Sequence, residues 1–338
     1  MMAVRLHYYQ APAGNFGDDL NKWMWSSLMP EITFDKSSST VLVGIGTIIN
    51  DSIPEGRRRI VFGSGAGYFP PPPDFAGEGW EIACVRGTLT ARALNLPVNT
   101  AITDGAILLA SLPEGRPASE RERSGIVFMP HVGAATTRGS WARVCRDAGI
   151  EYLDPRANSR ANLERIRTAK LVLADAMHAA IVADTLRVPW IPLATSDEIN
   201  SFKWLDWTSS MGLPYQPIRL PSSNLAEYAR NKAAGHKRNK YFVPDLSIDN
   251  VQRWFDHMCT GHKDPWDSIA WQLYRCVDLS LKAAWPLRAY INERLHECAV
   301  ETLRKISDSA GMLSSEQTFR RNTDQMVTRL DAVRLSVH

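Results

Sequence analysis

Residues 170–194 read KLVLADAMHAAIVADTLRVPWIPLA, and this stretch predicts the fold class. The apolar run 171–174 is typical of a buried strand, 179–186 has the composition of a helix, and VPWIPLA is a second apolar strand. Strand, helix and strand in this order form one unit of a parallel sheet. Pro189 and Pro192 indicate that the second strand lies near a sheet edge. His178 stands at the corner where the first strand gives way to the helix.

The same alternation extends in both directions along the chain. Strand-like and helix-like segments precede the corner in this order: VRLHYY, VLVGIGTII, RIVFGSG, EIACVRGTLTARAL, AITDGAILLAS, GIVFMPH, SWARVCRDAG, IEYLDP and NLERIRTA. After the first of them, Asn15 or Asp18 is suited to capping a helix that carries Leu20, Trp23 and Leu28. The pattern predicts an α/β protein with two Rossmann-like lobes that face a cleft.

Composition along the chain gives the domain boundaries. LPEGRPASERERSG (112–125) is rich in Pro, Gly and charge and is typical of a linker. We therefore predict one lobe over 1–112 and a second over 125–215. A C-terminal α-helical extension is expected over 216–338, interrupted at YFVPDLS and bent at AAWPLRAYINERL. Its tryptophans suit a helical layer that packs on the lobes, while membrane contact and homo-oligomerisation through this tail stay open.

The bulk properties narrow the class of protein. The 338 residues are 44% apolar and carry a net charge of +3, which gives no reason to expect a nucleic-acid partner. Five dispersed cysteines suit reduced thiols, and no metal-ligand spacing occurs, so we expect a metal-independent reaction without a cofactor. The N-terminus has no apolar signal core. We expect a cytoplasmic protein, with peripheral contact to the inner membrane left open.

The Gly-rich stretch GSGAGYFPPPP (63–73) does not fit a dinucleotide-binding motif. Its glycines follow the spacing G-x-G-x-G, and prolines stand where a helix should begin. Two interpretations remain, either a strand end whose backbone approaches a ligand or a tight turn.

Polar residues collect where the predicted strands end, which is where α/β sheets bind ligands. They are Asn15, Asp18, Ser64, Arg86, Asp104, His131 and His178. Each also has a structural interpretation: Asp18 as a helix cap, Asp104 as a turn residue, Arg86 in a local ion pair and His178 as a buried structural histidine. As a set they indicate an anion site, because Arg86, Lys203, His131 and His178 are potential cations and a helix begins near His178. Asp18 and Asp104 are suited to holding hydroxyl groups or accepting a proton.

Eight segments in order make the chain resemble the polysaccharide pyruvyl transferases. They are GNFGDDLN, VGIGT, GSGAGY, VRGTLTARAL, ITDGAILL, MPH, AMHAAIVADTLRVPW and NSFKWLDW, and the similarity spans residues 4–215. The resemblance implies a two-lobed fold like that of GT-B glycosyltransferases and phosphoenolpyruvate as co-substrate. The implied acceptor is a hexose of a lipid-linked or polymeric saccharide, and the implied product is a cyclic pyruvate ketal.

The resemblance also implies site residues. The family's corner histidine corresponds to His178 and the arginine of its VRG segment to Arg86. Many relatives have Arg-Leu-His at this corner, whereas this chain has Ala176-Met177-His178. A cation is therefore missing beside Met177, and Lys203, Arg138 or His131 are the candidates to replace it.

The resemblance and the charges of these residues predict their roles. His178 is the expected general acid, Arg86 and Lys203 hold phosphate and carboxylate, and Asp18 or Asp104 orients or deprotonates the sugar hydroxyls. Asn15, Ser64, His131, Arg138 and Met177 are expected to line the substrate site.

Two other functions remain open at this stage. The first is a GT-B glycosyltransferase that uses a nucleotide sugar, and the second is a non-catalytic assembly protein of a polysaccharide export complex.

Overall fold

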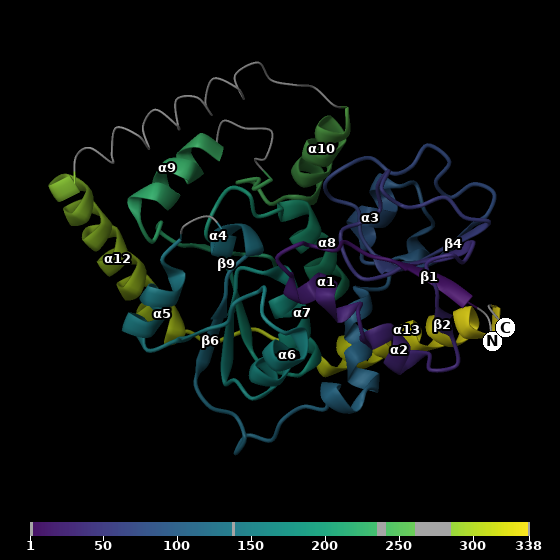
Figure 1. Cartoon of the computed structure of the whole chain (residues 1–338), viewed down its shortest axis with the longest axis horizontal. Helices are drawn as coiled ribbons and strands as arrows, with labels where there is room; N and C mark the ends of the chain where they lie inside the picture. The colour runs from purple at the N-terminus through teal and green to yellow at the C-terminus, as the bar shows by residue number, and fades with distance from the viewer. Residues whose placement is uncertain (1–2, 137–138, 235–240, 261–284, 337–338) are drawn as a thin grey trace.

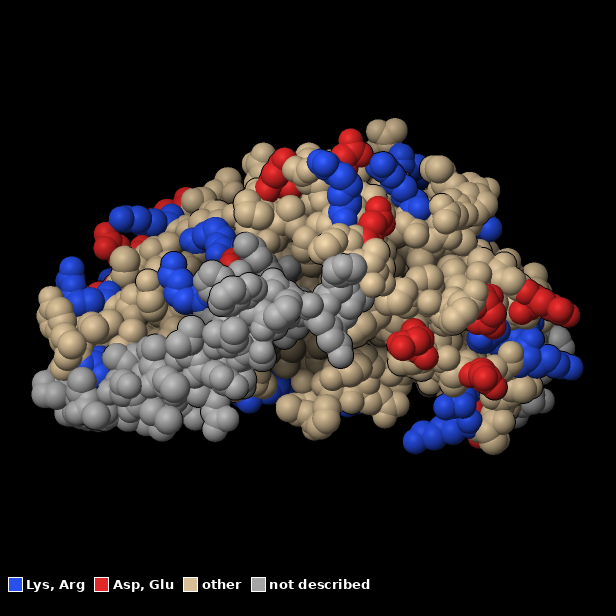
Figure 2. Space-filling view, turned by 90° about the horizontal axis from the view of Figure 1, so that it is seen from above, with Lys and Arg blue, Asp and Glu red and all other residues tan. Residues whose placement is uncertain are grey.

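A computed structural model describes residues 3–136, 139–234, 241–260 and 285–336. The described chain is a mixed α/β structure with two parallel sheets and a C-terminal helical region, as Figure 1 shows. Five strands make up each sheet. On the face shown in Figure 2, Lys and Arg are interspersed with Asp and Glu wherever the surface is described.

The first sheet has the strand order β2-β1-β3-β4-β5, and all its pairs are parallel. Its strands are β1 (Ala3–His7), β2 (Thr33–Phe34), β3 (Thr40–Val43), β4 (Arg58–Ser64) and β5 (Trp80–Val85). Every residue of β3 is buried, as expected for a strand with helices on both faces. The segment after β5 differs from the expected strand: Ala101 forms an isolated bridge with Val85, and the chain then continues into a 3₁₀ helix.

The second sheet repeats this topology. Its order is β10-β9-β8-β6-β7, with β6 (Ile126–Met129), β7 (Glu151–Tyr152), β8 (Leu171–Ala174), β9 (Trp190–Ala194) and β10 (Ile218–Arg219). Numbered from its first strand, each sheet has the doubly wound order 2-1-3-4-5, which differs from the 3-2-1-4-5 order of dinucleotide-binding Rossmann sheets. The order reverses between β1 and β3 in one sheet and between β6 and β8 in the other, and ligands of such sheets bind at that point. Strand β9, which contains Pro192 and follows Pro189, lies next to the edge strand β10, so the prediction that it lies near an edge is confirmed.

Short helices connect the strands of the first lobe. They are α1 (Phe16–Leu20), α2 (Met24–Leu28), α3 (Thr88–Ala93) and the 3₁₀ helices η1 (Val98–Thr100), η2 (Gly105–Ser111) and η3 (Pro113–Gly115). The single helix expected after the first strand is instead two, α1 and α2. Asn15 is the N-cap residue of α1, but its side chain donates to the Asp18 carboxylate and does not cap the helix.

Helices of the second lobe follow the predicted pattern more closely. They are α4 (Val132–Thr136), α5 (Trp141–Ala148), α6 (Ser159–Arg167), α7 (Met177–Thr185) and α8 (Ser201–Ser210). Helix α5 ends at Gly149, which adopts the left-handed conformation (φ 77°) that favours glycine at a helix end. Helix α7 begins at the corner identified in the sequence, and eight of its nine residues are buried.

The C-terminal region returns to both lobes. Its described helices are α9 (Leu225–Ala234), α10 (Ile248–Cys259), α12 (Trp285–Ser307) and α13 (Glu316–Ser336), and the expected interruption at 241–247 is confirmed. Helix α12 packs on α5, whereas α13 packs on β5 and η2 of the first lobe. Just before α13, Ser314 donates from its backbone N–H and its hydroxyl to the buried Asp184 of α7. Among the described helices, none has a long enough apolar stretch to span a membrane.

Candidate active site

The corner histidine lies against the backbone of the other lobe. His178 is the second residue of α7, and its side chain is 15% exposed. A Cβ atom on Gly17 of α1 would lie 2.0 Å from the Nδ1 atom of His178. The glycine in GNFGDD therefore leaves the space that the imidazole ring occupies, and α1 and α7 together fix the position of the ring.

Asp104 faces His178 from the first lobe. It is the N-cap of η2, where its Oδ1 accepts a hydrogen bond from Ala106 N at 3.0 Å. Its Oδ2 lies 3.9 Å from Nε2 of His178. Both atoms are buried, and neither has a hydrogen-bond partner among the described residues. Buried polar atoms without a partner are uncommon in folded proteins, so this pair is suited to receiving a polar ligand.

Burial determines the protonation of the pair. It lowers the pKa of His178 to about 3, helped by the positive charges of Lys203 and Arg86. Burial also raises the pKa of Asp104 to about 6, although Arg86 opposes the rise. His178 and Asp104 therefore do not form an ion pair at neutral pH, although their facing atoms lie 3.9 Å apart, because the imidazole is neutral without a ligand.

Asp18 brings a second carboxyl group to this region. Its Oδ2 accepts a hydrogen bond of 2.6 Å from the side-chain amide of Asn15, and a Cβ atom on Gly46 would lie 3.3 Å from its Oδ1. Burial raises the pKa of Asp18 to about 7, against the opposing charge of Lys203 and with the support of Asp19 and Asp104. Asp18 is thus able to hold or release a proton near neutral pH.

Lys203 supplies the cation of the site. It lies in the first turn of α8, where the Asn200 side chain accepts a hydrogen bond from its backbone N–H, and the residue is 9% exposed. Its ammonium group lies 5.7 Å from the centre of the Tyr68 ring, and no described carboxylate lies within ion-pair distance of it. Its charge nevertheless acts on the pKa values of Asp18, His131 and His178.

Arg86 is fully buried and holds the lobes together. Its Nε donates to Asp206 of α8 at 2.9 Å, and its terminal nitrogens donate to Thr47 Oγ1 and Ala66 O. The guanidinium lies over Gly65, where an added Cβ atom would be 2.2 Å from Cζ. Gly65 of GSGAG therefore makes room for Arg86. The predicted contact of Arg86 with phosphate stays a prediction. The sequence also allowed Arg86 to form a local ion pair. Arg86 does form an ion pair, but its partner, Asp206, is 120 residues away in the sequence.

Four other residues were predicted to line the substrate site, and the structure places three of them in different surroundings. Ser64 is fully buried and donates its hydroxyl to the carbonyl groups of Val43 and Gly44. Met177 is 2% exposed and belongs to the hydrophobic core. The ring of His131 accepts a hydrogen bond from Gly133 N, and burial lowers its pKa to about 3. Arg138 lies outside the described residues.

Asp175 and Asp206 hold neighbouring segments of the candidate site in position, and the sequence analysis did not select either residue. Asp175, at the end of β8, accepts hydrogen bonds from His131 N and from the backbone and hydroxyl of Thr195, and so ties together the ends of three strands. Asp206 accepts from Arg86 and from the backbone and hydroxyl of Thr90. Asp175 ends the run LVLAD, so its place at a strand end was a signal that could have found it.

The site thus unites His178, Asp104, Asp18 and Lys203 from both lobes. Within the described ranges, no group of three or more His, Cys, Asp or Glu residues is placed to hold a metal ion. These groups can bind an anion and move protons.

Comparison with known proteins then identifies the class. No family model matches the chain, and no solved structure does. A curated relative nevertheless shows that the chain belongs to the polysaccharide pyruvyl transferase family. This relative is the succinoglycan biosynthesis protein ExoV of Rhizobium meliloti (strain 1021). The two sequences are 39% identical over 336 residues, which cover 98% of this chain and 99% of the relative.

Proposed function

We propose that this protein transfers pyruvate from phosphoenolpyruvate to a hexose of an exopolysaccharide unit, carried on a lipid, and forms a cyclic pyruvate ketal. Family membership and the role in succinoglycan biosynthesis named for the relative support exopolysaccharide pyruvylation in general. The structural observation that carries the proposal is a pair of buried atoms, Asp104 Oδ2 and His178 Nε2, which lie 3.9 Å apart without a hydrogen-bond partner among the described residues. The positive charge of Lys203 acts on His178 of this pair.

The donor suits the charges of the site. Phosphoenolpyruvate carries a phosphate and a carboxylate, and Lys203 is a cation without a described carboxylate partner. We propose a GT-B-like arrangement in which the donor lies between the lobes with one anionic group at Lys203. Arg86 contributes its positive charge through space, because its hydrogen bonds are already directed to Asp206, Thr47 and Ala66.

The proposed reaction balances with the substrates alone. A proton adds to the methylene carbon of phosphoenolpyruvate and leaves an oxocarbenium-like centre at C2. One sugar hydroxyl forms a bond to C2, and the bond between C2 and the phosphate oxygen then breaks. A second hydroxyl adds to C2 and closes the ketal. Of the two hydroxyl protons, one replaces the proton given to the methyl group and the other leaves with phosphate.

His178 is the proposed general acid. Without a ligand its pKa is about 3, but a bound phosphate and carboxylate offset the positive charges of Lys203 and Arg86 and so raise that pKa. Asp18 and Asp104, with pKa values of about 7 and 6, are the proposed acceptors of the hydroxyl protons. General acid–base groups of this kind contribute about 10²–10⁴-fold in rate.

The experiment combines phosphoenolpyruvate with a panel of β-glucosyl and β-galactosyl acceptors, including lipid-linked ones. We expect release of phosphate and an acceptor that gains the mass of pyruvate minus water. His178→Ala is expected to lower the rate by roughly 10²–10⁴-fold. The matched control is His257→Ala at an exposed position, which is expected to leave the rate unchanged. Near-full activity of a folded His178→Ala variant would contradict the assignment of His178.

The other two functions give different results in the same assay. A glycosyltransferase would release a nucleoside diphosphate from a nucleotide sugar and leave phosphoenolpyruvate intact. A non-catalytic assembly protein would bind saccharide without releasing phosphate.

A further inference from the structure

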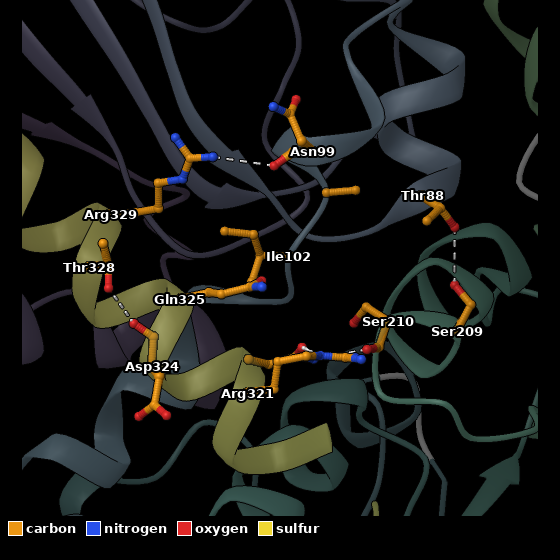
Figure 3. A pocket seen from close by; sticks show the side chains of 12 residues that line it. Thr88, Asn99, Ile102, Ser209, Ser210, Arg321, Asp324, Gln325, Thr328 and Arg329 are labelled. Atoms are coloured by element: carbon orange, nitrogen blue, oxygen red, sulfur yellow. Dashed lines mark hydrogen bonds between the residues drawn. The ribbon is translucent and has the colours of Figure 1, made fainter. Parts of the chain in front are cut away.

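A second pocket lies between the two lobes and α13, and it shares no residue with the cluster around His178. Its volume is about 750 Å³. The walls come from α3 and the segment after β5 in the first lobe, from the end of α8 in the second lobe, and from one face of α13 (Figure 3). Pockets of this size accommodate small organic ligands.

Two arginines of α13 give the pocket its charge. Arg321 Nε donates to Asn322 Oδ1 at 3.3 Å, and a terminal nitrogen of Arg329 donates to Asn99 O at 3.4 Å. Neither guanidinium forms an ion pair with a carboxylate in the described part of the chain. Asp324 also lines the pocket, but Figure 3 shows its carboxylate directed away from the guanidinium of Arg329. An anion is therefore the ligand that these arginines recognise best.

The remaining walls are suited to a sugar. The side-chain amides of Asn99 and Gln325 have no hydrogen-bond partner among the described residues. The hydroxyls of Thr88 and Ser209 face each other at 3.5 Å, a weak contact that a ligand hydroxyl could replace. Ile102 adds an apolar surface beside these groups. Two side-chain amides without a partner in the described chain, and two hydroxyls in weak mutual contact, of which Ser209 also donates to Asp206 O, match a ligand that carries many hydroxyl groups.

We propose that this pocket binds an anionic saccharide, a sugar that carries a phosphate or a carboxylate. The anionic group binds the guanidinium of Arg321 or of Arg329, which lie eight residues apart along α13, and the sugar hydroxyls contact the neighbouring side chains among Asn99, Gln325, Thr88 and Ser209. The inference does not rest on pyruvyl transfer, because none of these residues belongs to the candidate active site. Since both lobes and α13 form the walls, the ligand stabilises the folded assembly.

The test is calorimetric titration of the full chain at low salt with glucose 6-phosphate, glucuronate, glucose and inorganic phosphate. We expect at least one of the two anionic sugars to bind, and to bind more tightly than glucose or phosphate; the comparison between the two shows which anionic group is preferred. The double variant Arg321→Gln/Arg329→Gln is expected to bind it roughly 10- to 100-fold more weakly. The control is Arg320→Gln, since Arg320 is an exposed neighbour that pairs with Glu316.

A second variant separates loss of binding from loss of folding. Gln325→Glu keeps the arginines and adds a negative charge to an exposed position, so we expect a folded protein with weakened binding of the anionic sugar. The raised unfolding temperature that this sugar gives the wild type should shrink in the same variant. Unchanged binding in the double variant, equal loss in Arg320→Gln, or phosphate that binds as tightly as the sugar would overturn the proposal.

Discussion

Single side chains in the candidate site are governed by their removal from water. Burial favours the uncharged forms of His178, Asp104 and Asp18, since charged groups lose solvation in the interior. In this site the neutral imidazole of His178 faces a carboxyl oxygen of Asp104, and neither facing atom has a hydrogen-bond partner among the described residues. Such an arrangement is typical of sites that bind or transform a ligand.

The raised pKa of Asp18 makes stability depend on pH. Its pKa is about 7 in the folded protein and 3.8 in an unfolded chain, so the folded state binds more protons between these values. The free energy of unfolding therefore falls as pH rises from 4 to 8, by roughly 2–4 kcal/mol from this group. Asp18→Asn does not titrate, so we expect it to gain stability over the wild type across this range.

Urea unfolding of both proteins at several pH values measures this difference. The histidines with lowered pKa values contribute the opposite dependence, but they titrate in both proteins and cancel in the comparison. A constant difference between Asp18→Asn and the wild type would show that Asp18 has an ordinary pKa.

At the scale of elements, short helices determine how closely the lobes approach the site. Helix α1 has five residues, and its Gly17 lies against the ring of His178. A side chain at this position would force the ring or the helix to move, because 2.0 Å is far below a van der Waals contact. Gly17 is therefore a positioning residue for His178.

Gly17→Ala is expected to lower pyruvyl transfer by about 10-fold or more, since a displaced catalytic group loses its geometry. A double-mutant cycle with His178→Ala isolates the cause. If Gly17 acts through the ring, the double variant is no slower than His178→Ala alone. Additive losses would mean that Gly17→Ala acts elsewhere, for example by unfolding α1.

At the scale of the whole molecule, buried ionic contacts and the C-terminal helix join the lobes. Arg86 at the end of β5 pairs with Asp206 of α8, and both side chains are fully buried. Helix α13 follows the Ser314–Asp184 contact with the second lobe and then packs on the first. By joining the lobes, these contacts hold α3, α8 and α13 around the pocket that contains Arg321 and Arg329. They also keep Asp104 of the first lobe close to His178 of the second.

Removing the charge of Asp206 tests this connection. Asp206→Asn leaves Arg86 as a buried cation without an ionic partner, which is expected to cost about 3–5 kcal/mol of folding free energy. The matched control is Asp249→Asn, which breaks the exposed Arg92–Asp249 pair between α3 and α10 and should change stability little. Equal losses in chemical denaturation of the two variants would contradict the central role of the buried pair.

Local sequence was enough to predict most elements and the position of the corner. Apolar runs and the Gly149 stop reflect short-range rules, and α5, α7 and the β-strands around them were predicted from these rules. The same rules predicted one helix after β1, where the chain forms α1 and α2. Between the two helices, Asn21 is the C-cap of α1, and its side chain donates to Asp18 O and Ile45 O and accepts from Ile45 N. These contacts with another segment are not visible in the local pattern.

The sequence by itself determined the α/β alternation, the histidine at the β8–α7 corner and the family of the protein. Tertiary structure alone decided that Arg86 pairs with Asp206, 120 residues away, and that Asp104 meets His178. Periodicity is a property of neighbouring residues, so it can be read along the chain. Contacts between lobes depend instead on how whole sheets and helices pack, and no local pattern encodes them.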